Sequence, residues 1–449
     1  MTYAAAVARL LELGHELWST GRKFDLAHMQ ALTRALGHPE RRFASVLIAG
    51  TNGKGSTAAT LAGILQAAGY RTGLYTSPHL VIVNERIRLD GAAISDPEFT
   101  EIFRRIQETA ERLVARGELP WPPSYFETLT AMAFEYFASS GVEIAVLEVG
   151  MGGRLDATNV VEPCVAVITD IALDHEKFLG NTVSAIAGEK AGIIRAGGVV
   201  VTLPQHPEAN DVIGNTILQR DARGVSAVPY VPPVSPGAPR AALLVADEKL
   251  RNRYPLSVLN SEIVVDSPLI GRHQLRNVAL AIATAIELKA CGFPVTAQQI
   301  ERGIQQTRWP GRLQLVAAHD GWPDVLLDVA HNPAGAWALR SALSEYFAGR
   351  RLVFVFGAMR DKAVAEIAEI LFPLAERVIA TRAAGGNPRA AEPEEIVATC
   401  SRLTADWTTA ATVASALGEA RANALDETLI VVTGSIYIVG ETLQILDGA

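Results

Sequence analysis

The sequence has few of the features that mark secreted, membrane-bound or nucleic-acid-binding proteins. Only three cysteines occur among 449 residues, far apart and in apolar surroundings, which excludes a disulfide framework and a CxxC metal site. No apolar stretch reaches about 18 residues, and Met1 to Gly14 lack the basic flank and cleavage site of a signal peptide. We therefore expect a cytoplasmic protein without a membrane partner.

An excess of basic residues is also missing. Forty Lys and Arg stand against 48 Asp and Glu, which gives a formal net charge of −8 and no overall positive field for nucleic acid. Hydrophobic residues make up 49% and charged residues 20%, a composition typical of globular chains. The length suits about two or three domains. Because no coiled-coil pattern or long amphipathic face demands a partner chain, we expect a monomer that does not bind nucleic acid.

Strand and helix patterns alternate from Phe43 almost to the end, which predicts an α/β fold with mostly parallel sheets. The first half has strand patterns at 45–49, 71–76, 144–148 and 165–169 and helical patterns at 55–68, 97–116, 126–137, 182–195 and 274–290. From 205 to 268 the pattern weakens, and five prolines between 229 and 239 favour a hairpin-rich excursion over a core helix. Trp309-Pro310-Gly311 is the best boundary, with a second, smaller, Rossmann-like α/β domain over 309–449.

The sharpest motif is Ala49-Gly-Thr-Asn-Gly-Lys-Gly-Ser-Thr57, between a strand pattern and a helical pattern. Backbone N–H groups of a glycine-rich turn at a helix N-terminus converge on an anion, Lys54 can neutralise terminal phosphates, and a hydroxyl can reach Mg²⁺. The motif departs from the common P-loop because Gly55 follows the lysine. We interpret it as a nucleotide site rather than a plain strand-to-helix turn, which makes residues 1–308 an N-terminal P-loop ATPase domain.

Polar residues follow the next two predicted strands. Glu148 ends one of these strands, a position where a nucleotide site needs an acid to hold its metal. The alternative interpretation of Glu148 is a surface acid at a strand end. The glycine-rich segment after it carries Arg154, whose guanidinium can receive a carboxylate or phosphate. His175 and Lys190 follow the next strand. On chemistry alone, a structural histidine competes with a metal ligand because Mg²⁺ prefers oxygen, and a solvated or ion-paired lysine competes with a catalytic one.

Together these motifs resemble the folylpolyglutamate synthase and dihydrofolate synthase family, within the ATP-dependent amide ligases that include the Mur ligases. The resemblance extends from Gly50 to Gly440 and so covers nearly the whole chain. It rests on Gly50–Ser56, Thr76–His79, Asn84–Ile87, Glu148–Asn159, Asp174-His175 with Leu179-Gly180, Glu189–Gly192, Arg276-Asn277, Gly311-Arg312, Asp328–Pro333 and Gly434-Ser435.

The resemblance implies where ATP and Mg²⁺ bind. The nucleotide would contact Gly50, Thr51, Asn52, Gly53, Lys54, Gly55, Ser56, Thr57, Asn277, Arg312 and Asp328. The metal would be held by Ser56, Ser77, Glu148, His175 and Lys190. By the same resemblance Lys190 would be carbamylated, which turns an ammonium into a carbamate that donates oxygen to Mg²⁺. The catalytic group implied in this way comprises Lys54, Glu148, His175, Lys190, Asp328 and His331.

The resemblance also implies the substrate contacts. His331 and Ser435 would lie near the incoming glutamate, although His331 could instead cap the helix that begins at Pro333. The stretches Phe24–Leu26 and Ser124–Glu127 resemble the family's pteridine-contacting loops. The substrate-binding candidates are therefore Asp25, Phe126, Arg154, His331 and Ser435.

The implied reaction is an ATP-dependent ligation that forms a carbon–nitrogen bond. ATP would phosphorylate a carboxylate, and the α-amino group of L-glutamate would attack the acyl phosphate, releasing phosphate beside ADP. Dihydropteroate as acceptor would give dihydrofolate, and reduced folates would gain γ-linked glutamates. We expect both activities.

Three alternatives to this reading remain. The first is folylpolyglutamate synthesis alone. The second is a Mur ligase for cell-wall precursors, which is disfavoured because only 49 residues precede Gly50 and Gly55 replaces the usual threonine. The third is a P-loop switch, which needs no second α/β domain.

Overall fold

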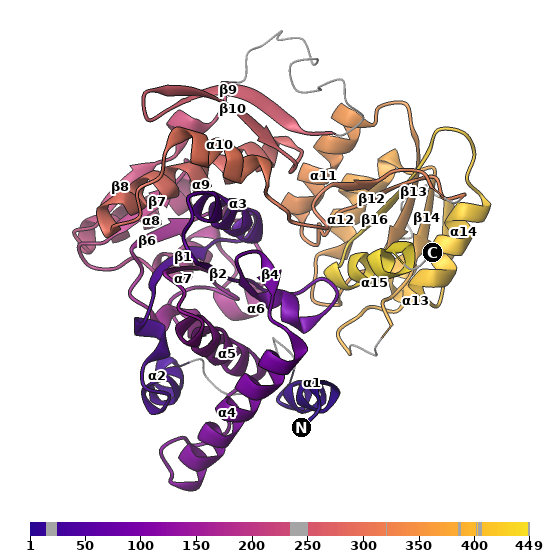
Figure 1. Cartoon of the computed structure of the whole chain (residues 1–449). Helices are drawn as coiled ribbons and strands as arrows, with labels where there is room; N and C mark the ends of the chain where they lie inside the picture. The colour runs from indigo at the N-terminus through magenta and orange to yellow at the C-terminus, as the bar shows by residue number, and fades with distance from the viewer. Residues whose placement is uncertain are drawn as a thin grey trace. The chain divides into compact units, whose positions relative to one another are not determined.

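The computed structural model describes residues 1–14, 25–233, 250–319, 321–384, 388–400, 402 and 406–447 (Figure 1). The chain divides into two compact units. Of the described residues, the first unit contains 1–14, 25–233, 254–266 and 276–307, and the second contains 250–253, 267–275 and those from 308 onwards. Each unit is built around a mostly parallel sheet, which confirms the predicted α/β class.

The first unit contains, within the described residues, an eight-stranded sheet in the order β4-β3-β2-β5-β1-β6-β7-β8. β2 pairs in parallel with β5, and each strand from there to β8 is parallel to the next, while β3 and β4 add an antiparallel edge. The central strands are continuous apolar runs, as expected for a sheet covered on both faces. The strands are β1 (Ala44–Ala49), β2 (Thr72–Tyr75), β3 (Ile87–Leu89), β4 (Ala92–Ala93), β5 (Ile144–Glu148), β6 (Val165–Ile168), β7 (Val199–Thr202) and β8 (Arg223–Ser226).

Helices cover the two faces of this sheet. Figure 1 shows α3, α9 and α10 on one side of it and α4 and α5 on the other. Among the described residues, no helix combines the length and the apolar character that a membrane span requires. The helices are α1 (Tyr3–Glu12), α2 (Leu26–Ala35), α3 (Lys54–Ala67), α4 (Asp96–Ala115), α5 (Tyr125–Ser139), α6 (Glu176–Leu179), α7 (Val183–Ala191), α8 (Pro207–Gln219), α9 (Arg272–Glu287) and α10 (Ala297–Gln305).

Two predicted segments differ from the structure. The helix expected over 182–195 ends at Ala191, since Gly192 closes it and lies against Arg154, where a Cβ would stand 2.4 Å from the arginine Cβ. The excursion expected over 205–268 includes the helix α8, whose Ala209 and Ile213 are buried. The prolines that favoured an excursion lie at 229–239, beyond this helix, and Pro207 does not oppose it because it is the first helical residue, where no backbone N–H is needed.

The predicted hairpin is present in the same region. β9 (Asn252–Val258) and β10 (Ser261–Ser267) form a two-stranded sheet, and β9 alternates buried and exposed residues along its length. Leu259 and Asn260 join the strands, both with positive φ, as a tight two-residue turn requires. Residues 234–239 of the proline-rich stretch lie outside the described residues.

The second unit has, in its described part, a six-stranded sheet in the order β11-β12-β16-β13-β14-β15, parallel except for β11. Because β12 and β16 are parallel neighbours, the loops that follow them meet at one edge. The strands are β11 (Gln314–Val316), β12 (Asp324–Leu327), β13 (Arg351–Phe356), β14 (Arg377–Ala380), β15 (Asp406–Thr409) and β16 (Thr428–Thr433). The helices are α11 (Pro333–Tyr346), α12 (Val364–Leu371), α13 (Pro393–Thr399), α14 (Val413–Ala422) and α15 (Ile436–Asp447).

Helices α3 and α10 cross at two glycines. A Cβ on Gly303 would lie 2.3 Å from the Ile64 Cα, and a Cβ on Gly63 would lie 2.8 Å from the Gly303 carbonyl oxygen. Both obstacles are backbone atoms that cannot rotate away. The close approach of these helices therefore depends on the absence of side chains at both positions.

We predict that Gly303→Ala lowers the free energy of unfolding by about 1–3 kcal/mol, because the added methyl group forces the two helices apart. The matched control is Gly214→Ala in α8, where a Cβ would meet no atom within 4 Å. That variant should be neutral or slightly stabilising, since alanine is the better helix former. Denaturant unfolding of the full chain measures the free energy of unfolding of both variants. Equal effects of the two substitutions would contradict the steric requirement for glycine at the crossing of α3 and α10.

Candidate active site

The predicted P-loop is the turn between β1 and α3. Gly53, directly before α3, has a φ of +88°, and a Cβ there would stand 2.2 Å from the Asn277 Oδ1. Glycine is therefore required, and Asn277, which the resemblance implied as a nucleotide contact, lies against the P-loop. Gly53 has no side chain with which to cap α3, and the N–H groups of the first helical turn suit an anion.

The side chains of the P-loop are arranged around this turn. The Lys54 Nζ donates a hydrogen bond to the Thr51 carbonyl oxygen at 3.2 Å. Ser56 and Thr57 are buried, and the Thr57 Oγ1 makes no hydrogen bond to any described residue. An ammonium and hydroxyl groups at a helix start suit a phosphate chain and its metal.

Lys190 comes from α7 and lies under the same turn. Its Nζ donates a hydrogen bond to the Gly50 carbonyl oxygen at 2.7 Å, and the side chain is almost completely buried. Burial, together with the positive charge of Lys54, lowers the pKa of Lys190 to about 7, while Asp174 and Asp156 act in the opposite direction. The structure thus brings Lys54 and Lys190 together from positions far apart in the sequence.

Glu148 and Ser77 meet at the carboxyl ends of β5 and β2. Glu148 is 5% exposed and pairs in register with Ile48, two residues before Gly50. The Ser77 backbone N–H donates to the Glu148 Oε2 at 3.2 Å. These two predicted metal ligands are therefore neighbours next to the P-loop.

His175 directly precedes the short helix α6 and has a φ of +53°, and its N–H donates to the Asp174 Oδ1 at 2.8 Å. Within the part of the chain that the structure describes, no three His, Cys, Asp or Glu side chains are close enough to hold a metal ion. A Mg²⁺ site built on Glu148 would therefore need hydroxyl and phosphate oxygens as well, which are ligands that Mg²⁺ accepts.

The segment from Glu148 to Asn159 is fastened onto α7. The Arg154 backbone N–H donates to the Glu189 carbonyl oxygen, and the two side chains pair at 2.8 Å. Gly153 permits this contact, since a Cβ there would stand 2.8 Å from the same carbonyl oxygen. The Arg154 guanidinium, predicted to bind substrate, is therefore engaged by Glu189 in this structure.

Asp156, in the same segment, is a buried acid that the residue-based search did not single out. Its carboxylate accepts hydrogen bonds from the N–H groups of Met151 and Thr158, both at 3.0 Å, and from the Thr158 hydroxyl at 2.6 Å. Burial raises its pKa despite these bonds. The signal in the sequence was an aspartate just after the Gly-Gly-Arg run.

The predicted folate-contacting residues lie at the starts of α2 and α5. Asp25 caps α2 by accepting the Ala27 N–H at 2.9 Å, and Phe24 lies outside the described residues. Phe126 packs beside Tyr75, and its ring lies 2.5 Å from where a Cβ on Gly150 would stand. Phe126 thus contacts the segment that follows Glu148.

A histidine joins these two helix starts. The His28 Nδ1 pairs with the Glu127 carboxylate at 3.0 Å, and its ring stacks on Trp121 with centroids 5.9 Å apart. Neither His28 nor Trp121 belongs to a motif that pattern reading could have found.

In the second unit the predicted residues gather where β12 and β16 end. Asp328 accepts the N–H groups of Leu313 and Ala330, each at 2.9 Å, and burial raises its pKa while the Arg312 charge opposes this. Gly434 donates its N–H to the Ala330 carbonyl oxygen at 3.0 Å, which ties the two loops together.

His331 and Ser435 belong to these same two loops. The His331 Nδ1 lies 2.9 Å from the Val329 carbonyl oxygen, and Ser435 is buried. The cap of α11 is Asn332, whose Oδ1 accepts the Gly335 N–H at 2.8 Å. The alternative role for His331, as the helix cap, is therefore wrong.

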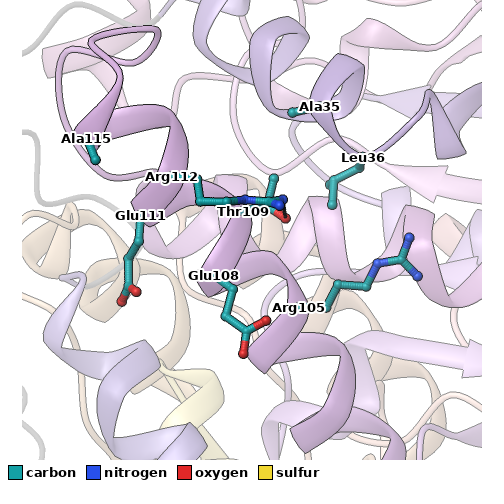
Figure 2. A pocket seen from close by; sticks show the side chains of 8 residues that line it. All are labelled: Ala35, Leu36, Arg105, Glu108, Thr109, Glu111, Arg112 and Ala115. Atoms are coloured by element: carbon teal, nitrogen blue, oxygen red, sulfur yellow. Dashed lines mark hydrogen bonds between the residues drawn. The ribbon is translucent and has the colours of Figure 1, made fainter.

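A hollow of about 670 Å³ lies elsewhere in the first unit, beside α4 (Figure 2). Its arginines already have partners: Arg105 pairs with Glu135 at 2.6 Å, and Arg112 donates to the Thr109 hydroxyl at 3.0 Å. It is lined by Ala35, Leu36, Arg105, Glu108, Thr109, Glu111, Arg112 and Ala115, and none of these is a predicted site residue. We assign this hollow no part in the reaction.

Two family models match the chain. The Mur ligase middle domain matches residues 48–285, and the Mur ligase glutamate ligase domain matches residues 311–436. A dihydrofolate synthase/folylpolyglutamate synthase of Bacillus subtilis is 35% identical to this chain over 428 residues, which cover 94% of both proteins.

Solved structures agree with these matches. Folylpolyglutamate synthase of Mycobacterium tuberculosis, complexed with ADP and AMPPCP, has a TM-score of 0.82 at 32% identity and covers 99% of this chain and 98% of its own. Escherichia coli FolC, in complex with DHPP and ADP, has a TM-score of 0.81 at 30% identity and covers 100% and 98%. The motifs, the fold and these relatives agree, and the chain belongs to the dihydrofolate synthase/folylpolyglutamate synthase family of Mur-type, ATP-dependent ligases.

Proposed function

We propose that this chain couples ATP cleavage to the addition of L-glutamate to dihydropteroate and to the γ-carboxylate of reduced folates. The observation that carries the proposal is the convergence of Lys54, Glu148 and Lys190 on the turn after β1. A site with this charge pattern suits a nucleotide triphosphate with a divalent cation. The names of the Bacillus subtilis and Escherichia coli relatives support the choice of substrates.

The chemistry requires activation of the acceptor, because a carboxylate does not react with an amine near pH 7. Transfer of the γ-phosphoryl group to the carboxylate gives an acyl phosphate. The glutamate amine then forms the amide and phosphate leaves. Lys54 and the N–H groups at the start of α3 would bind the phosphate oxygens and stabilise the charge that develops on them.

Glu148 and Ser77 are proposed to hold Mg²⁺ with Ser56 and His175, and the oxygen-rich set fits a hard cation. When bound, the cation would offset negative charge on the transferring phosphoryl group. Glu148 is buried at the end of a central strand, where a bound cation would offset its negative charge.

Lys190 is proposed to be a carbamate in the working enzyme. Its lowered pKa leaves a large share of the amine neutral near pH 7, and a neutral amine can add to carbon dioxide with loss of one proton. The product is an anion, which would lie beside the Lys54 ammonium and supply oxygen to the cation. An unmodified ammonium in the same place would repel Mg²⁺.

The second unit is proposed to supply Arg312 and Asp328 for the nucleotide and His331 and Ser435 for glutamate. This assignment is supported by the hydrogen bonds that Asp328 accepts from the backbone N–H groups of two loop segments. At the acceptor end, Phe126 offers an aromatic face next to Gly150, which suits a flat pterin ring.

The function is tested by incubating the full chain with ATP, Mg²⁺ and glutamate, and with dihydropteroate or a reduced folate monoglutamate as acceptor. We expect acceptor-dependent ADP release and products one glutamate heavier by mass with both acceptors. Lys54→Ala should lower the rate about 100- to 1,000-fold, because the phosphates lose their lysine. Product from the folate alone would leave only tail extension, and ADP release independent of any acceptor would overturn the ligase assignment.

We predict that Glu148→Gln lowers the rate about 100-fold or more and raises the Mg²⁺ concentration needed for half-maximal activity, because the amide keeps the shape but loses the charge. Glu143→Gln is the matched control, since Glu143 is exposed just before the same strand and should leave the rate within about twofold. An unchanged Mg²⁺ dependence in Glu148→Gln would remove Glu148 from the metal site.

We predict that Lys190→Ala abolishes ligation and that acetate partly restores it, because a small carboxylate can replace the missing carbamate. Lys289→Ala, at an exposed lysine, should keep the wild-type rate and show no response to acetate. Full activity of Lys190→Ala without acetate would return Lys190 to a purely structural role.

A further inference from the structure

The loop after β6, residues 169–172, is hydrogen-bonded to the P-loop. The N–H groups of Thr51 and Asn52 both donate to the Asp170 carbonyl oxygen, at 2.8 and 3.1 Å. The Thr51 hydroxyl donates to the Ala172 carbonyl oxygen at 3.0 Å and lies 3.1 Å from the Ala172 N–H, which donates to it. The direction of the first two P-loop peptides is therefore set by this loop.

The same loop is held from its other side by charged and amide side chains. Arg276 contacts the Asp170 carboxylate through Nη2 at 2.6 Å and through Nε at 3.1 and 3.2 Å, and its Nη2 also donates to the Pro204 carbonyl oxygen at 2.9 Å. Gln205 donates to the Thr169 carbonyl oxygen at 3.0 Å and accepts the Ile171 N–H at 2.8 Å. The loop is fixed between the P-loop and the turn after β7.

Arg276 is also the neighbour of Asn277, which lies against Gly53 at the start of α3. One turn of α9 thus touches the nucleotide site in two ways, through Asn277 directly and through Arg276 by way of Asp170. The Arg276 and Asp170 side chains are 31% and 38% exposed. An ion pair with that much solvent contact adds little to global stability, so its main consequence is local geometry.

We propose that Asp170 and Arg276 are positioning residues for the phosphate chain of ATP. They keep the loop after β6, and through it the N–H groups of the P-loop, in the arrangement that receives an anion. The inference rests on the proposed function, since the ligand is the nucleotide of that site. Arg276 acts through Asp170 and does not itself bind phosphate, because its planar donor group is already occupied by the carboxylate.

The test is a double-mutant cycle on the full chain, with the dissociation constant of ADP and Mg²⁺ measured by calorimetry. Asp170→Asn and Arg276→Met should each weaken ADP binding by about 5- to 30-fold, and the double variant should be no weaker than either single one, because both remove the same contact. Arg276→Lys keeps the positive charge but loses the planar guanidinium. Its ADP affinity should therefore lie between that of the single variants and that of the wild type. In turnover, the KM for ATP should rise more than kcat falls.

Glu162→Gln is the matched control. Glu162 pairs with Arg195 at 3.2 Å just before the same strand β6, at the end away from the P-loop, and its loss should leave ADP affinity unchanged. Melting temperatures without nucleotide show whether each variant is folded. A lower melting temperature with unchanged ADP affinity would make the pair merely structural and overturn the proposal.

Two further outcomes separate the possible failures. If Asp170→Asn binds ADP more tightly while Arg276→Met binds it more weakly, Arg276 is a direct phosphate ligand and the positioning role is wrong. If the wild-type chain does not bind ADP at all, the proposed function itself fails. If the wild type binds and both single variants stay within about twofold of it, only the inference about Asp170 and Arg276 is overturned.

Discussion

The arrangement of the first unit depends on the central position of β1, which is parallel to β5 on one side and to β6 on the other. Parallel neighbours end at the same edge of a sheet, and the ladder hydrogen bonds continue into the loops. The Val149 N–H donates to the Ile48 carbonyl oxygen, and the Thr169 N–H donates to that of Ala49. The P-loop, the acid of β5 and the loop after β6 therefore start from one line of backbone bonds.

Burial of the Lys190 charge is the main unfavourable contribution to the stability of this arrangement. Lys190 is covered and has the positive charge of Lys54 nearby, and both effects favour the neutral amine. Its hydrogen bond to the Gly50 carbonyl oxygen satisfies one donor in either form. The same conditions that make a buried ammonium unfavourable provide the reactive amine that carbamate formation needs. The unfavourable burial of the Lys190 charge and the proposed carbamate formation thus have the same physical cause.

The second unit likewise brings loops together by pairing parallel strands. β12 and β16 are parallel neighbours, and the loops after them are joined by the Gly434 to Ala330 hydrogen bond. Asp328 then organises the start of the loop by accepting two backbone N–H groups. A buried carboxylate that is satisfied by backbone donors holds a loop more firmly than an exposed one, because water cannot compete for its lone pairs.

The sequence alone determined the features that are local in the chain. Apolar runs and glycine-rich turns predict β1, the P-loop and α3, and they place Glu148 at a strand end, because each depends on neighbours within a few residues. Which strands are neighbours and which distant side chains meet depends on the folded arrangement of the whole unit. Lys190 reaches Gly50 across 140 residues, and Arg276 reaches Asp170 across 106. The close approach of Arg154 to Gly192, at the end of α7, is likewise a contact between residues 38 positions apart. Such contacts depend on strand order and helix packing, which the periodicity of a single segment does not encode.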